Sequence, residues 1–148
     1  MTLSASTEQR IRSLLREAVW EDSDPFDSVF PAILKAASSL QERGLTGENY
    51  VQGLLRRESI SSCALANGML LQYSLVPAKK TGISFLVFRH QMNWGNYRIR
   101  AVATACFAPE ERPLVFSVKN YFCYMNQTLD VSHQVHCAED LKKLILSP

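Results

Sequence analysis

Apolar residues in the first part of the chain recur at helical spacing. The segment IRSLLREAVW, residues 11–20, predicts a short helix that runs directly into a strand. Apolar positions then repeat every three or four residues over 26–40, which predicts a second, longer helix. A proline fits a helix only in its first turn, so Pro31 indicates that this helix begins near Asp27 or Ser28.

The pattern changes from helical to strand-like in the middle of the chain. A third helix is predicted with Thr46 as its N-cap and ends before residue 60. Runs of apolar and β-branched residues, separated by PAKKTG and NWGNY, then predict strands at 69–73, 83–88 and 99–107. The run 83–88 is apolar nearly throughout, which is typical of a central strand covered on both faces.

Further helical patterns follow the strands, over 114–125 and 138–146. Helices before and after a group of strands are typical of layered α/β domains. We therefore expect an α/β fold, with a central mixed β-sheet flanked by helices on both faces. With 148 residues and 47% hydrophobic content, the chain suits a single three-layer domain that spans residues 1–148.

Charge and hydropathy exclude two classes of partner. The formal net charge is only +2, and the basic pairs stand among acidic residues, which favours solvated surface over contact with nucleic acid. These pairs are Arg56-Arg57, Lys79-Lys80 and Lys142-Lys143. No apolar run approaches the ~18 residues of a membrane span, and the N-terminus lacks a secretory pattern. We expect a cytoplasmic protein without membrane insertion.

Cysteine and histidine spacing gives no support for a metal site. The four cysteines are irregularly spaced, and Cys106 and Cys123 stand among apolar residues, where we expect them to pack as small hydrophobes. His133, His136 and Cys137 form a local cluster, but no carboxylate or further ligand is supplied at metal-binding spacing. We expect no metal and no cofactor.

Five segments, taken in order, carry a resemblance to a known family. They are GLTGENYVQGLLRRE, CALANGMLLQYS, KKTGISFLVFRHQMNWG, CFAPEERPL and AEDLKKLI. Their succession over residues 11–145 resembles the enzyme IIA domain of the fructose/mannitol type from the bacterial phosphotransferase system, closest to its ascorbate-type branch. The resemblance implies a domain that accepts a phosphoryl group on histidine from the histidine phosphocarrier protein and passes it to a IIB component.

The residues that the family uses for this chemistry differ in this chain. A family member reads something like A-P-G-I-A-L-P-H-A-R, which falls on residues 66–75, so the phosphohistidine position matches Tyr73 and the arginine position roughly Leu75. The second histidine of the family matches Pro113. The resemblance thus implies a pocket formed by Asn67, Gln72, Tyr73, Ser74, Leu75 and Pro113.

The substitutions argue against phosphoryl relay. An imidazole is a nucleophile at neutral pH, whereas a phenol, with an unperturbed pKa near ~10, is a poor one without an activating base. Pro113 and Leu75 have side chains that donate no hydrogen bond. We therefore expect a domain that lacks catalytic competence and regulates sugar uptake or sugar-operon transcription by binding, either alone or joined to a transcription regulator.

Two alternatives remain open at this point. In the first, the chain is an active, sugar-specific phosphocarrier that uses His90, which stands with Arg89 at the end of a predicted strand. In the second, the pocket around Tyr73 holds a small ligand instead of a phosphoryl group.

Overall fold

A four-stranded mixed sheet forms the centre of the molecule. The structure, a computed structural model, describes residues 4–60, 67–74 and 76–146. Its strands are β1 (Val19–Ser23), β2 (Met69–Tyr73), β3 (Gly82–Trp94) and β4 (Tyr97–Cys106). The sheet has the order β1-β3-β4-β2: β3 and β4 are antiparallel, while β1 runs parallel to β3 and β2 parallel to β4. This confirms the predicted mixed sheet with the 83–88 run at its centre.

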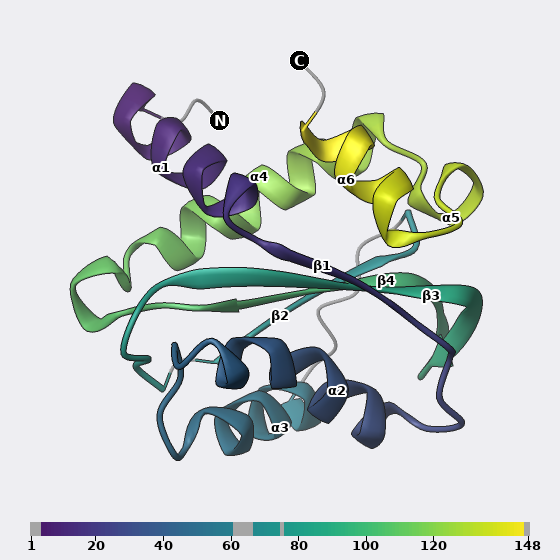
Figure 1. Cartoon of the computed structure of the whole chain (residues 1–148), viewed down its shortest axis with the longest axis horizontal. Coiled ribbons are helices and arrows are strands. Elements are labelled where there is room, and N and C mark those ends of the chain that lie inside the picture. The colour runs from purple at the N-terminus through teal and green to yellow at the C-terminus, as the bar shows by residue number, and fades with distance from the viewer. Residues whose placement is uncertain (1–3, 61–66, 75, 147–148) are drawn as a thin grey trace.

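Helices cover both faces of the sheet (Figure 1). One face carries α2 (Val29–Glu42) and α3 (Tyr50–Ile60). The other carries α1 (Ala5–Arg16), α4 (Leu114–Thr128), α5 (Val131–Gln134) and α6 (Ala138–Leu146), with the 3-10 helix η1 (Pro109–Glu111) leading into α4. The predicted α/β fold with helices on both faces is therefore confirmed.

Alternating side chains of β3 supply a separate hydrophobic core on each face. Phe85 and Val87 belong to the core beneath α1, α4 and α6, whereas Leu86 and Phe88 belong to the core beneath α2 and α3. Successive side chains of a strand point to opposite faces, so a strand buried on both sides is expected to be apolar at nearly every position. This explains the run at 83–88, in which the one polar residue, Ser84, is buried and donates a hydrogen bond to the carbonyl oxygen of Ala36.

Two helix boundaries test the turn chemistry that the sequence predicts. Ser28 is the N-cap residue of α2, which places Pro31 in the first turn as predicted. The predicted N-cap of the next helix is wrong, because α3 begins only at Tyr50 and Thr46 is buried in the preceding connection. The buried ring of Tyr50 anchors this helix, since its hydroxyl donates a hydrogen bond to the carbonyl oxygen of Ala105.

The β3–β4 hairpin extends further than the predicted strands. The register shifts between Val87 and Met92, and the pairing then continues to Trp94 opposite Tyr97. Arg100 lies opposite this irregularity and donates from one guanidinium nitrogen to the carbonyl oxygens of Phe88 and Arg89. The polar residues 89–91 made the run look finished, although they only interrupt it.

Gly53 permits the close approach of α3 to the end of β2. A Cβ atom at this position would lie 1.9 Å from the Oγ of Ser74 and 2.8 Å from a methyl group of Val76. We expect Gly53→Ala to destabilise the fold by roughly 1–2 kcal/mol, because overpacking outweighs the gain in helix propensity. Urea unfolding measures this change.

Two variants control for the Gly53 prediction. Gly47→Ala introduces a Cβ that has no atom within 4 Å, and it should leave stability nearly unchanged. Adding Ser74→Ala to Gly53→Ala removes the nearest atom and should recover part of the loss. Equal stability of Gly53→Ala and the wild type would contradict the packing of α3 described above.

Candidate functional site

Tyr73 ends β2, opposite Ala105 of β4, and its side chain is 7% exposed. An Nη atom of Arg57, in the last turn of α3, donates a hydrogen bond of 3.1 Å to the Tyr73 hydroxyl. The same guanidinium lies 5.1 Å from the centre of the tyrosine ring, within the range of a cation–π interaction. The position matched to the phosphohistidine is therefore occupied by a phenol in contact with a cation.

Arg57 is the residue of the candidate site that the sequence analysis missed. The pair Arg56-Arg57 was predicted to be solvated surface, and the arginine of the family was matched to Leu75, which lies outside the described residues. The structure instead brings a cation to Tyr73 from the preceding helix. A signal was available, because Arg57 stands in the last turn of the helix that leads into β2, but the packing angle of that helix is not visible in the sequence.

The segment that contains Arg112 lies beside Ser74, the residue that follows β2. Ser74 is buried, and its Oγ accepts a hydrogen bond of 3.1 Å from the backbone nitrogen of Val76. With Arg112 and Val115 it lines a cavity of about 10 Å³. The segment that contains Pro113 therefore lies beside the end of β2. The close approach of Pro113 to Tyr73 itself stays a prediction.

Two residues of the predicted pocket have other roles. Gln72 is buried, and its amide donates a hydrogen bond of 2.9 Å to the hydroxyl of Thr104 within the sheet. Asn67 precedes β2, where its amide donates to the carbonyl oxygen of Leu129. At about 3.3 Å per residue, six residues of extended chain separate Asn67 from Tyr73 by about 20 Å. The structure therefore does not bring Asn67 to the Tyr73 end of the sheet.

The three histidines of the chain lie at the opposite end of the sheet from Tyr73. Tyr73 is level with Ile83, since both pair with Ala105, and His90 follows seven residues further along β3. That separation is about 20 Å. The side chain of Gln91 donates to the backbone of Ser132, which places α5 with His133, and His136 just beyond it, at this distant end.

The cluster around His133 has a structural explanation. Asp130 is the N-cap of α5 and accepts a hydrogen bond from the backbone nitrogen of His133, and its carboxylate lies 2.8 Å from the His133 ring. These contacts lower the pKa of the Asp130 carboxyl. Among the residues that the structure describes, no group of three potential ligands could hold a metal ion.

The exposure of Cys106 and Cys123 tests the prediction that both pack as small hydrophobes. Cys106 is fully buried, and burial raises the pKa of its thiol to about 11, so it packs as a small hydrophobe as predicted. The prediction for Cys123 is wrong, because this residue lies on the exposed side of α4. The preceding residue, Phe122, is buried, whereas Cys123 and Tyr124 are both exposed.

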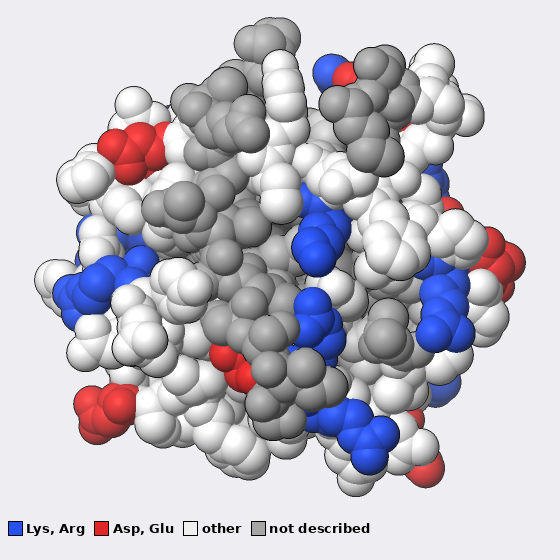
Figure 2. Space-filling model, turned by 180° about the vertical axis from the view of Figure 1, so that it is seen from behind, with Lys and Arg blue, Asp and Glu red and all other residues white. Residues whose placement is uncertain are grey.

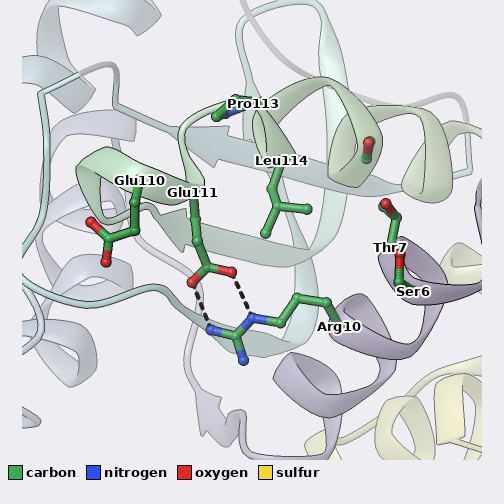
Figure 3. Close-up of a pocket in the computed structure, with 8 residues that line it drawn as sticks. Ser6, Thr7, Arg10, Glu110, Glu111, Pro113 and Leu114 are labelled. Carbon is green, nitrogen blue, oxygen red and sulfur yellow. Dashed lines mark hydrogen bonds and ion pairs between the residues drawn. The ribbon is translucent and has the colours of Figure 1, made fainter.

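A larger cavity lies between α1 and the start of α4 (Figure 3). It has a volume of about 310 Å³ and is lined by Ser6, Thr7, Arg10, Glu110, Glu111, Pro113, Leu114 and Ser117. Arg10 forms two hydrogen bonds of 2.7 and 2.8 Å with the carboxylate of Glu111, which ties α1 to η1. The two glutamates make this cavity unfavourable for a phosphoryl group, so we place the candidate site at the Tyr73 end of β2.

The Arg10–Glu111 pair predicts a pH-dependent contribution to stability. The hydrogen bond from Arg10 lowers the pKa of the Glu111 carboxyl below that of an unfolded chain, near ~4.3. The stabilisation is therefore present above that value and is lost as the pH falls through the lowered pKa. Because both side chains are partly exposed, we expect Glu111→Gln to cost less than about 1 kcal/mol at neutral pH.

Urea unfolding at a series of pH values tests this expectation. The difference between the wild type and Glu111→Gln should shrink as the pH falls below about 4. The exposed i,i+4 pair Arg12–Glu8 gives a matched control, since Glu8→Gln should have a smaller effect. A difference for Glu111→Gln that is independent of pH would contradict the ion pair.

Comparison with known proteins supports the same family in sequence and in fold. No family model matches the chain. It is 31% identical over 87 residues to the multiphosphoryl transfer protein of Vibrio cholerae, a match that covers 56% of this chain and 22% of that protein. It is 32% identical over 75 residues to the mannitol-specific phosphotransferase enzyme IIA component of Halalkalibacterium halodurans, covering 48% of this chain and 52% of that protein.

Solved structures show the same architecture over nearly the whole chain. The mannitol-specific cryptic phosphotransferase enzyme IIA CmtB of Escherichia coli has a TM-score of 0.71 at 15% identity, with 91% of this chain and 99% of that one covered. The enzyme IIA in the complex of enzyme IIAMtl and phosphorylated enzyme IIBMtl of Escherichia coli has a TM-score of 0.68 at 16% identity, with 99% of both chains covered.

These structures establish the fold as that of the mannitol-type enzyme IIA domains. Together with the sequence matches, they confirm the predicted resemblance to enzyme IIA domains of the fructose/mannitol type. The matched regions span between about a fifth and a half of the curated relatives' lengths. The narrower assignment to the ascorbate-type branch stays a prediction.

Proposed function

We propose that this domain binds protein partners of the phosphotransferase system without relaying phosphate, and so regulates sugar uptake or sugar-operon transcription. One observation carries the proposal. The residue at the end of β2 is a tyrosine held by Arg57, while His90 lies about 20 Å away along the sheet, at the end where His133 and His136 also lie. A phosphoryl group brought to this end of the sheet meets no imidazole that is able to accept it.

The fold supports the binding half of the proposal. An enzyme IIA of the same architecture was solved in complex with phosphorylated enzyme IIB, at a TM-score of 0.68. We infer that a IIB component, or the histidine phosphocarrier protein, docks on this chain at the exposed surface around Arg112 and Pro113, beside the end of β2. None of the helices within the described ranges has both the length and the apolar character of a membrane span.

The alternative that uses His90 is disfavoured by position and surroundings. His90 is exposed on β3 in the irregular segment of the hairpin, and the nearby cation Arg89 forms an ion pair with Asp24. A phosphoryl group on His90 would therefore depend on a cation that is already neutralised. A transfer site there would also need a docking surface at the other end of the molecule.

Titration of the isotope-labelled chain with IIB components of the mannitol, fructose and ascorbate types tests the proposal. We expect binding by at least one component, with NMR shifts concentrated at residues 73–74 and 112–117. Backbone amides near His90 and His133 serve as the internal control and should shift little. Absence of binding to all components and to the phosphocarrier protein, or shifts centred on His90, would overturn the proposal.

A further inference from the structure

We propose that the cavity between α1 and the start of α4 binds a small amine that carries several hydroxyl groups, in its protonated form. The inference goes beyond the proposed function and does not depend on the binding of a protein partner. The ligand is held by charge at one end of the cavity and by hydroxyl groups at the other. It is bound and released unchanged, so no covalent bond is formed or broken.

The cavity lies between two helices that the hydrophobic core holds in place. Ile11 and Leu14 of α1 are buried in the core on this face of the sheet, and so is Val118 of α4. The ion pair between Arg10 and Glu111 joins α1 to η1 along one side of the cavity (Figure 3). The walls are therefore positioned before a ligand enters, which reduces the cost of ordering them on binding.

The charged groups that line the cavity leave one carboxylate available to a cation. Glu111 is engaged, because it accepts two hydrogen bonds from Arg10 and a further one from the side chain of Thr81. Glu110 is exposed at the rim, and among the described residues no cation forms an ion pair with it. The lining therefore carries an excess of negative charge, which attracts a protonated amine and repels an anion.

The charge of this cavity differs from that of the face of the molecule seen from behind. Figure 2 shows Lys and Arg side chains near the middle of that face. Such a surface repels a cation, whereas the rim of the cavity at Glu110 attracts one. A small amine is therefore directed to the cavity.

Hydroxyl groups line the other end of the cavity. Figure 3 shows Ser6 and Thr7 of α1 on the opposite side from Glu110. The Thr7 hydroxyl accepts a hydrogen bond of 2.8 Å from Ser4, so its own hydrogen is available to an oxygen atom of the ligand. Ser117 adds a hydroxyl from α4. Groups that both donate and accept hydrogen bonds suit the hydroxyl groups of a ligand.

The size of the cavity limits the ligand to a small molecule. Its volume of about 310 Å³ lies at the lower end of the range of about 300–1,000 Å³ that is usual for small-molecule pockets. Pro113 and Leu114 supply apolar surface against which the carbon atoms of a ligand can pack. An amine with several hydroxyl groups on a short carbon chain matches the size, the charge and the hydrogen-bonding groups of this cavity.

Titration of the isotope-labelled full chain with N-methyl-D-glucamine, followed by NMR, tests the inference. This probe is a protonated amine with several hydroxyl groups, and sorbitol, a polyol of similar length without the charge, is its matched control. We expect saturable shifts at residues 6–10 and 110–117, with a dissociation constant of about 1 mM or below, the affinity that ordinary ligand efficiency gives a molecule of this size. Sorbitol should bind about threefold more weakly or less tightly still.

Three variants test the two ends of the cavity separately. Glu110→Gln should weaken the binding of N-methyl-D-glucamine about threefold or more and leave that of sorbitol unchanged. Thr7→Val should weaken both probes by similar factors, because it removes a hydroxyl and no charge. Glu42→Gln removes a carboxylate from the exposed end of α2, on the opposite face of the sheet, and should change neither affinity. Melting temperatures confirm that each variant is folded.

The outcomes separate this inference from the proposed function, because no partner protein is present in the titration. Equal affinity for N-methyl-D-glucamine and sorbitol would overturn the proposal, and so would an unchanged affinity in Glu110→Gln. Absence of saturable shifts with either probe at about ten times the expected dissociation constant would also overturn it. Each of these results would leave the binding of phosphotransferase-system partners untouched, and failure to bind those partners would leave this site in place.

Discussion

Phe85→Ala is expected to lower the free energy of unfolding by about 3–5 kcal/mol, the range for removing a large aromatic side chain from a packed core. Phe85 is 1% exposed in the first half of β3. Its ring stacks on that of Trp20 in β1, with 4.1 Å between the ring centroids and an interplanar angle of 3°. The centroid of the Phe122 ring in α4 lies 6.0 Å away. One side chain thus joins a neighbouring strand to a covering helix.

Urea unfolding followed by tryptophan fluorescence measures the loss. Trp20 reports on the same cluster, so its emission should also shift in the folded variant. Tyr97→Ala is the matched control, because that ring is 48% exposed at the hairpin and its removal should cost less than about 1 kcal/mol. A loss below about 1 kcal/mol for Phe85→Ala would contradict the core described between the sheet and α4.

The layered fold was predictable because each element leaves a local pattern in the sequence. Residues 69–73 were predicted as a strand with the bounds that β2 has, and the almost entirely apolar run at 83–88 marked the central strand. The outer part of β3 was missed because Arg89 and His90 are exposed at the irregularity, and only beyond them do Met92 and Trp94 return to the core. The order of the strands depends on contacts between residues that are far apart in the sequence. The local spacing of apolar residues carries no information about those contacts.

The candidate site was only partly predictable for the same reason. Tyr73 was found from its place at the end of a strand, and the resemblance pointed to the segment around Pro113. Arg57 reaches Tyr73 only because α3 packs closely on β2, a contact that depends on the small size of Gly53. Asn67 was assigned to the pocket because the family motif falls on residues 66–75, but an extended strand carries the two ends of that segment far apart.

The second prediction with a large expected effect is that this chain does not accept a phosphoryl group. Incubated with phosphoenolpyruvate, enzyme I and the histidine phosphocarrier protein, the chain should acquire no acid-labile phosphohistidine. Removing a single donor from a charge-stabilising site typically costs about 10² to 10³ in rate, and here the position that the resemblance matches to the nucleophilic histidine holds Tyr73. We therefore expect labelling below about 1% of that of an active mannitol-type enzyme IIA assayed in parallel.

This labelling experiment tests the central claim most directly, because it asks whether the chain carries phosphate at all. The predicted result is background labelling of the wild type that is unchanged in His90→Ala, together with full labelling of the active enzyme IIA control. Variants His133→Ala and His136→Ala extend the comparison to the remaining histidines. Stoichiometric labelling of the wild type that disappears in His90→Ala would contradict the account and establish an active phosphocarrier.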